Sequence, residues 1–188
     1  MIIPAYNEEE SILNTVMSIV EYRKKVDFDL DYVVINDGSV DRTKEILDSH
    51  HLNAIHLVMN LGIGGAVQTG YKYALENNYD VAVQFDGDGQ HDIESLDALL
   101  EPIRRQQADL VVGSRFIGDK SSEFQTTFMR RFGITIISAF IKLTTGKRIL
   151  DTTSGYRLAN QDIIRQFAAR YPIKYPEPES IVHILKRK

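Results

Sequence analysis

An acidic segment at residues 86–90, Asp-Gly-Asp-Gly-Gln, carries the side chains of this chain that are best suited to chemistry. It directly follows the apolar run 81–85, which predicts a buried strand. Side chains at every second position of an extended segment share one face, so Asp86, Asp88 and Gln90 can present three oxygens to one cation. Mg²⁺ and Mn²⁺ prefer such oxygen ligands. The segment therefore predicts a divalent-metal site, and a solvated acidic turn is the simpler alternative.

Three further polar segments also follow apolar runs. Residues 4–9, Pro-Ala-Tyr-Asn-Glu-Glu, lead into a helical pattern, where free backbone N–H groups can meet a ligand. Residues 36–41, Asn-Asp-Gly-Ser-Val-Asp, offer Asp37 to a nucleobase or ribose. Residues 60–66 are similar to a phosphate-cradling glycine loop but match neither the dinucleotide nor the Walker pattern. A capped helix start also explains residues 4–9, a capped turn is the better explanation of residues 36–41 taken alone, and residues 60–66 are a weak signal by themselves. The prediction therefore depends on all of them together.

Composition narrows the class of protein. The net charge is -4 and the pI about 5.7, which disfavours nucleic-acid binding because such proteins usually carry a basic surface. The absence of cysteine excludes disulfides, cysteine-based zinc sites and thiol catalysis. The sequence shows no signal-peptide pattern and no apolar run near the roughly 20 residues that cross a bilayer. We therefore expect a cytoplasmic protein, with any membrane contact peripheral, at the inner face of the membrane, or made through a partner.

The chemistry-bearing segments need a frame that brings them together, and the chain predicts one. Apolar runs alternate with helical periodicity, which is typical of an α/β fold with a mostly parallel central sheet flanked by helices. Such sheets bind ligands beyond the carboxyl ends of their strands. We expect one domain over residues 1–170 and a proline-rich, charged tail over 171–188. The expected strands are 2–3, 32–35, 55–58, 81–85 and 110–112, and the expected helices include 8–22, 62–75, 92–106, 126–143 and 161–169.

Taken in order, these segments closely resemble family 2 glycosyltransferases, which are inverting enzymes with a GT-A fold. The similarity is to the branch with dolichyl-phosphate mannose synthase and bacterial polyprenyl-phosphate glycosyltransferases. Residues 113–116, Gly-Ser-Arg-Phe, and 151–157, Asp-Thr-Thr-Ser-Gly-Tyr-Arg, also look like that branch. The resemblance spans Pro4 to about Leu158 and implies a hexosyltransferase. It implies a UDP- or GDP-sugar donor, Mg²⁺ or Mn²⁺ as cofactor, and a polyprenyl (dolichyl or undecaprenyl) phosphate acceptor.

The resemblance also implies roles for individual residues. The metal would be held by Asp86 and Asp88, with Gln90 as a further ligand, and Asp88 counts among the catalytic residues. The phosphate of the acceptor lipid would be held by Arg115, Arg131 and Ser154, with Arg130 as a close alternative. The nucleotide would contact Pro4, Ala5, Tyr6, Asn7, Glu8, Asp37, Gly62 and Asp86.

The identity of the acceptor decides whether a general base is needed. A lipid phosphate is already an anion, so arginines that position it suffice. A sugar hydroxyl calls for a carboxylate base, for which Asp151 is the candidate, with Glu177 or Glu179 behind it. For Asp151 a local turn carboxylate is an equal alternative. Residues 129–132, Met-Arg-Arg-Phe, precede an apolar helical pattern. A core-packing helix with solvated arginines is the commoner explanation in soluble proteins, and the family resemblance favours contact with a membrane surface instead.

Other interpretations stay open. The second candidate is a transferase that adds sugar to a saccharide hydroxyl in cell-wall or surface polysaccharide synthesis. A non-catalytic sugar-nucleotide-binding domain is a third, because the first strand is short and the chain ends where relatives continue, which suggests truncation. Asn36 stands where many relatives carry a first aspartate. Among the histidines, His91 lies beside Gln90 and is a candidate for the site, whereas His56 and the others are expected on the surface or in packing.

Overall fold

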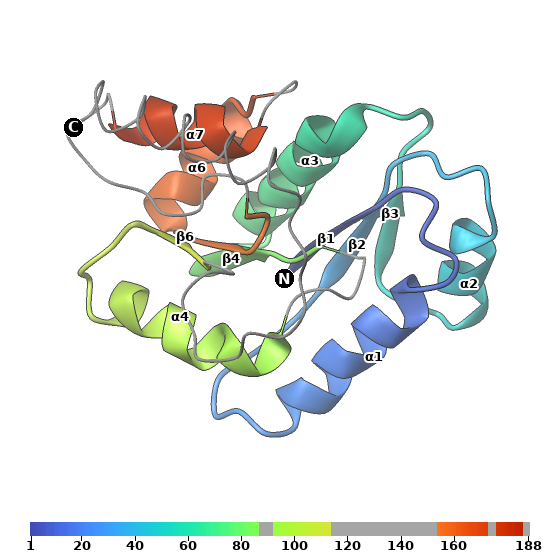
Figure 1. Ribbon diagram of the computed structural model, residues 1–188, viewed down its shortest axis with the longest axis horizontal. Coiled ribbons are helices and arrows are strands. Elements are labelled where there is room, and N and C mark those ends of the chain that lie inside the picture. The colour runs from blue at the N-terminus through green and yellow to red at the C-terminus, as the bar shows by residue number, and fades with distance from the viewer. Residues whose placement is uncertain (87–91, 114–153, 173–175, 186–188) are drawn as a thin grey trace, which may run out of the picture.

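The computed structural model describes residues 1–86, 92–113, 154–172 and 176–185. Within them a six-stranded sheet has the strand order β3-β2-β1-β4-β6-β5 (Figure 1). The strands are β1 (Ile2–Ala5), β2 (Val33–Asn36), β3 (Ala54–His56), β4 (Val81–Gln84), β5 (Leu110–Val112) and β6 (Arg157–Asn160). The helices are α1 (Ile12–Arg23), α2 (Thr43–Ser49), α3 (Gly62–Glu76), the 3-10 turn η1 (Ile93–Ser95), α4 (Leu96–Arg104), α6 (Gln161–Ala169) and α7 (Pro176–Leu185).

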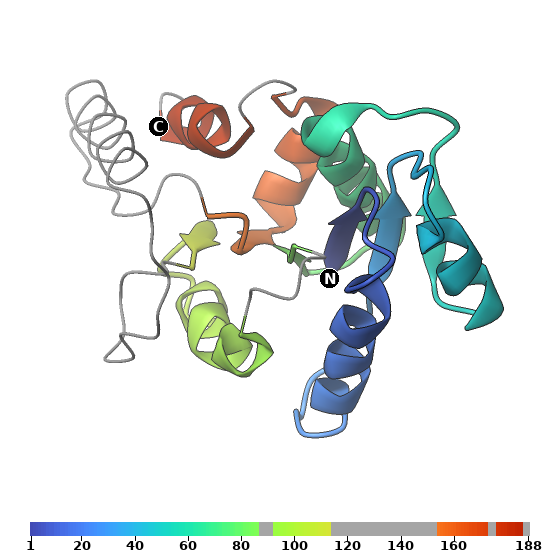
Figure 2. The same cartoon turned by 45° about the vertical axis from the view of Figure 1, so that its right-hand side comes forward.

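The sheet has a hydrophobic core on each face because its strands are apolar at consecutive positions. In β1, Ile3 packs with α1 and α4 in one buried cluster, whereas Ile2 packs with α3 and α6 in the other. In β2, Val34 and Val33 divide in the same way, as expected when successive side chains point to opposite faces. Figure 1 shows α3, α6 and α7 on one side of the sheet and α1 and α4 on the other, and Figure 2 shows the same layers from an oblique direction.

Four strands run in parallel, so their carboxyl ends lie along the same edge of the sheet. β1 pairs in parallel with β2 and β4, and β2 pairs in parallel with β3. β6 is antiparallel to both β4 and β5, so the sheet is mixed but mostly parallel, which confirms the predicted fold class. Gln84 at the end of β4 pairs with Arg157 at the start of β6. Residues 154–156 therefore lie at the same edge as the carboxyl ends of β1 to β4.

Several expected boundaries differ from the structure. No strand was expected at 157–160, where the structure has β6. The helix expected from Glu8 begins at Ile12. The segment 171–188, expected to be a tail, contains α7, whose Ile184 joins the buried cluster around α3 and α6. The helix expected at 126–143 lies outside the described residues.

The glycine-rich stretch 60–66 is mostly helix, because α3 begins at Gly62, where the helix over 62–75 was expected to begin. A glycine in this helix serves packing: a Cβ at Gly70 would lie 2.1 Å from a methyl carbon of Ile2. The bare backbone at Gly70 thus lets α3 approach β1 closely. No helix in the described part of the chain is long and apolar enough to span a bilayer.

Candidate active site

The loops that follow β1 and β2 are joined by reciprocal hydrogen bonds. The Asn7 N–H donates to Ser39 Oγ at 3.0 Å, and the Val40 N–H donates to Asn7 Oδ1 at 2.9 Å. Asn7 has a φ of 57°, a left-handed conformation that asparagine adopts more readily than most residues. The conformation of one loop therefore fixes that of the other.

A second set of hydrogen bonds ties the segment before α1 to the segment before α2. The Glu8 N–H donates to Thr43 Oγ1 at 2.8 Å, and the Glu9 N–H donates to Asp41 Oδ2 at 3.1 Å. Together with the bond from Asn7, these contacts use the N–H groups that the sequence had left open for a ligand. A ligand at this loop would therefore meet side chains and carbonyl groups, because the N–H groups of residues 7–9 are already bonded within the protein.

Asp41 is the charged member of this set. Burial by itself would raise the pKa of Asp41. Hydrogen bonds from the hydroxyl and backbone N–H of Thr43 and from the Glu9 N–H outweigh that effect, so the pKa is lowered below its ordinary value. Asp41 Oδ1 accepts the Thr43 N–H at 3.0 Å, although the residue at the N-cap of α2 is Arg42. The Ser39 hydroxyl does not bond α2, because it accepts the Asn7 N–H in the neighbouring loop.

Asp37 lies where the ends of β1 and β2 meet the segment that leads into α3. It is only 3% exposed, its N–H donates to the Ala5 carbonyl at 2.9 Å, and its Oδ1 accepts the Leu61 N–H at 2.7 Å. A carboxylate at this position also interacts favourably with the partial positive charge at the N-terminus of α3. Gly38, with a φ of 67°, packs so closely that a Cβ there would lie 2.8 Å from the Asn60 nitrogen. The turn after β2 is thus held against both neighbouring loops.

The residues predicted to bind the nucleotide differ in how far they are exposed to solvent. Pro4 and Ala5 are buried within β1, so their side chains serve the core. Tyr6 is 46% exposed, Asn7 is exposed, and Glu8 is half-buried with its carboxylate 2.6 Å from Ser11 Oγ. Gly62 has a φ of 76°, and no atom lies within 4 Å of a Cβ placed there. The described loops bring Tyr6, Asn7, Glu8, Asp37 and Gly62 to one edge of the sheet.

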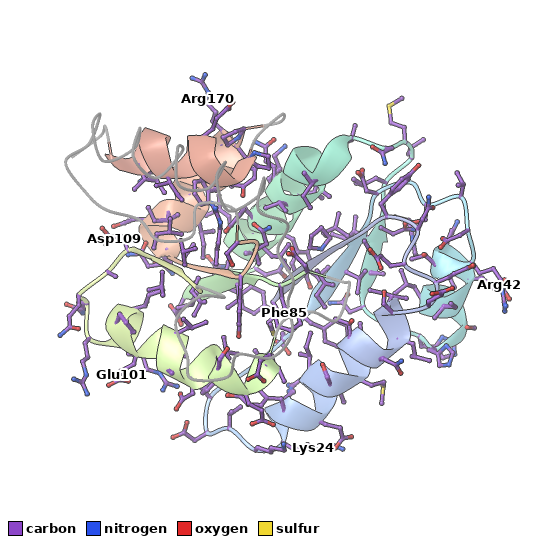
Figure 3. All side chains as sticks on the ribbon, viewed as in Figure 1. Lys24, Arg42, Phe85, Glu101, Asp109 and Arg170 are labelled. Carbon is purple, nitrogen blue, oxygen red and sulfur yellow. The ribbon has the colours of Figure 1, made fainter. Side chains whose placement is uncertain are left out.

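Asp86 and Gly155 meet at the carboxyl end of β4. A Cβ at Gly155 would lie 2.2 Å from Asp86 Oδ2 and 2.5 Å from Oδ1, so the carboxylate rests directly against the glycine. Below this contact, the rings of Phe85 and Tyr156 pack edge to face with centroids 5.3 Å apart. Figure 3 shows Phe85 in the middle of the molecule, whereas Arg42 lies at the edge beside α2. Glycine at 155 is the residue that leaves room for the Asp86 carboxylate.

A buried arginine supports the turn that contains Gly155. Arg157 is 0% exposed; its Nε donates to the Ser154 carbonyl at 2.9 Å, and its Nη1 donates to Ser180 Oγ on α7 at 2.7 Å. Ser154 is also fully buried, and its Oγ accepts the Tyr156 N–H at 3.3 Å. Contact between Ser154 and an acceptor phosphate stays a prediction, and it requires the hydroxyl to become accessible. Burial also raises the pKa of Tyr156 well above its ordinary value.

The other predicted site residues lie outside the described part of the chain: Asp88, Gln90, Arg115, Arg130, Arg131 and Asp151. Within the described ranges, no group of three or more histidine, cysteine, aspartate or glutamate side chains could hold a metal ion. Asp86 is the predicted metal ligand that the structure describes, and its hard oxygens fit Mg²⁺ or Mn²⁺. Glu179, one of the two glutamates considered as a general base after Asp151, is exposed on α7.

Sequence reasoning missed two features of this edge. His56, expected on the surface or in packing, bonds both Asn36 and Asp48. Its partners lie 20 and 8 residues away, so no local spacing indicated the contact. The role of Arg157 was also missed. The available signal was its place in the Ser-Gly-Tyr-Arg segment, which contains the candidate Ser154 and closely follows the candidate Asp151.

Comparison with known proteins gives consistent matches. A family model described as glycosyl transferase family 2 matches residues 1–167. An undecaprenyl-phosphate mannosyltransferase from Micrococcus luteus is 35% identical over 170 residues, which cover 87% of this chain and 67% of that protein. A UDP-N-acetylglucosamine–dolichyl-phosphate N-acetylglucosaminyltransferase from Methanococcus voltae is 30% identical over 206 residues, covering all of this chain and 79% of that protein.

A solved structure with the same fold is glucosyl-3-phosphoglycerate synthase from Mycobacterium tuberculosis, in complex with Mn²⁺, UDP-glucose and glycerol 3-phosphate. The TM-score is 0.72 at 19% identity, and the match covers 98% of this chain. This chain spans 64% of the length of that structure. At this identity the likeness concerns the fold.

Proposed function

The chain belongs to glycosyl transferase family 2, and from that premise we propose that it transfers a sugar from a UDP- or GDP-sugar to a polyprenyl phosphate with inversion. The observation that carries the proposal is the contact between Asp86 and Gly155 at the carboxyl end of β4. The Asp86 carboxylate lies just beyond the carboxyl end of β4, the side of the sheet on which α/β folds bind ligands, and this position supports the proposal. The relatives from Micrococcus luteus and Methanococcus voltae, named for polyprenyl acceptors, support the choice of acceptor.

The donor nucleotide would lie across the ends of β1 to β4. Tyr6 offers an exposed ring on which a base can stack. Asp37 keeps Oδ1 on the Leu61 N–H, and its second oxygen is the candidate acceptor for an N–H of the base. Asp86 would hold the diphosphate end of the donor through a divalent cation, together with Asp88 and Gln90. When bound, that cation neutralises the charge that develops on the departing diphosphate.

The acceptor requires little acid–base chemistry. A phosphate monoester is an anion near neutral pH, so Arg115, Arg131 or Arg130 would hold it in line with the anomeric carbon. We propose peripheral contact with the membrane that contains the lipid. If the acceptor is instead a saccharide hydroxyl, Asp151 would act as the general base.

The test is a transfer assay with labelled UDP- and GDP-sugars and undecaprenyl or dolichyl phosphate, in the presence and absence of Mn²⁺. We expect metal-dependent transfer to the lipid. Asp86→Asn should reduce the rate by about 100-fold or more, since it removes charge at the diphosphate site. Asp162→Asn is the matched control, because Asp162 is exposed at the start of α6. Transfer to soluble saccharides alone would favour the hydroxyl-directed alternative, and binding of the donor without any transfer would indicate a non-catalytic domain.

A further inference from the structure

His56 connects two polar side chains at the carboxyl end of β3. Its Nδ1 lies 3.0 Å from Asn36 Nδ2 at the end of β2, and its Nε2 lies 3.1 Å from Asp48 Oδ1 on α2. Asn36 is 2% exposed, whereas Asp48 is exposed. Figure 1 shows β3 beside β2 at the end of the sheet next to α2. The three side chains thus form a line from the surface to the buried end of β2.

The backbone fixes the direction of every hydrogen bond in this line. The Ser39 N–H donates to Asn36 Oδ1 at 3.1 Å, and a backbone N–H can only donate. The amide of Asn36 must therefore turn its NH₂ group toward His56. His56 Nδ1 must then be an acceptor, which makes His56 a neutral imidazole with its proton on Nε2. That proton is donated to Asp48, whose carboxylate only accepts.

The line ends at the turn that holds the candidate nucleotide residues. Asn36 precedes Asp37 and bonds Ser39, and Ser39 in turn accepts the Asn7 N–H at 3.0 Å. We infer that His56 is a positioning residue for the nucleotide pocket: as the Nε2–H tautomer fixed by Asp48, it holds Asn36 and so the 36–39 turn. The inference rests on the proposed function, because it names the device that orients the donor site.

The tautomer provides a direct test that a merely space-filling histidine would not satisfy. ¹⁵N NMR of the ring nitrogens of His56 in the intact chain should show a protonated Nε2 and an unprotonated Nδ1 at neutral pH. In Asn36→Asp, a carboxylate oxygen replaces the NH₂ group beside Nδ1, so a proton should appear on Nδ1, facing the new acceptor. A wild-type His56 protonated on Nδ1 would overturn the inference.

Nucleotide affinity tests the consequence, using calorimetry with UDP and GDP in the presence of Mn²⁺. His56→Asn keeps an acceptor near the position of Nδ1, and we expect its affinity to stay within about twofold of wild type. His56→Gln keeps a donor near Nε2 but loses the link to Asn36, and it should bind about five- to tenfold more weakly. Circular dichroism of each variant checks folding, and His50→Gln, exposed after α2, is the control.

The outcomes separate the two proposals. Equal affinity of wild type and His56→Gln would overturn the positioning role while leaving the proposed function intact. If the wild type binds neither nucleotide, the proposed function fails and the positioning role fails with it. The NMR result would then still report whether the hydrogen bonds of His56 run as inferred.

Discussion

Around the loops after β1 and β2, neighbouring segments are joined by hydrogen bonds through side chains that are mostly exposed or half-buried. Asn7, Ser39 and Asp41 take part in several of these bonds. Around the end of β4 and the start of β6, the segments are joined by close packing and a buried guanidinium group. Gly155 leaves no free space beside Asp86, and Arg157 is completely buried.

This difference predicts different responses to mutation. A hydrogen bond near the surface contributes about 1 kcal/mol, because water can replace either partner. When a buried charged donor is lost, or a steric overlap is introduced, water cannot compensate. Such a change therefore costs more free energy than the loss of a surface hydrogen bond. We therefore expect the β4–β6 half of the site to tolerate single changes poorly, whereas the β1–β2 half should respond in small steps.

The largest effect is expected for Arg157→Met, which keeps the apolar stem and removes the guanidinium. The Ser154 carbonyl and the Ser180 hydroxyl would each lose a buried donor. We expect the free energy of unfolding to fall by about 3 kcal/mol in urea denaturation. Arg165→Met is the control: its partner Asp162 is exposed, so the change should stay below about 0.5 kcal/mol. Equal losses in both variants would show that burial does not distinguish the two arginines.

The next effect is expected for Gly155→Ala. The new methyl group would overlap the Asp86 carboxylate, at 2.2 Å from Oδ2, and the side chain must rotate away. Because displacing a group that holds the metal and donor can lower the rate about 100-fold, we expect such a loss in sugar transfer, together with a lower Tm from the overlap. Gly113→Ala is a milder comparison, since its added methyl group would meet side-chain carbons of Tyr156 and Leu99 at 3.2 and 3.3 Å and no carboxylate. Wild-type turnover in Gly155→Ala would refute the importance of this contact.

A smaller effect is expected for Ser39→Ala in the β1–β2 half. It removes the acceptor of the Asn7 N–H, a partly exposed hydrogen bond of 3.0 Å. Nucleotide affinity should weaken about fivefold, which corresponds to about 1 kcal/mol. Ser49→Ala, on the exposed end of α2, should leave the calorimetric Kd unchanged. A 100-fold loss in Ser39→Ala would show that the two halves do not differ as proposed.

The smallest effect is expected for Asp41→Asn and depends on pH. The pKa of Asp41 is lowered on folding, so its ionised form stabilises the fold above the unfolded pKa of about 3.9. That stabilisation disappears as the pH falls through the lower, folded-state pKa. At pH 7 the free energy of unfolding of the wild type should exceed that of Asp41→Asn by less than about 1 kcal/mol. This difference should disappear below about pH 4. A gap that widens in acid would contradict the assignment.

Much of the frame was predictable because its signals are local. The apolar runs in β1, β2 and β4 indicated buried strands, and the polar segment after each run placed Asp37 and Asp86 at one edge. The position of α6 was also predicted from its periodicity, and the structure confirms it as Gln161–Ala169.

The remaining features depend on contacts that the sequence pattern does not encode. β6 begins with a buried arginine rather than an apolar residue, so the sequence pattern did not predict a strand there. The contact between Gly155 and Asp86 exists only because β6 pairs antiparallel with β4. α7 was missed because prolines suggested a tail, yet Pro176 opens the helix, where proline is well tolerated.

The central claim is that both halves of the edge form one nucleotide site. Backbone NMR of the ¹⁵N-labelled chain, titrated with UDP or GDP in the presence of Mg²⁺, tests this most directly. The account predicts that one nucleotide shifts the amide signals of Asn7 and Asp37 together with those of Asp86 and Gly155, with the same saturation curve. Shifts confined to one half or to another surface, or no shifts with either nucleotide, would contradict it.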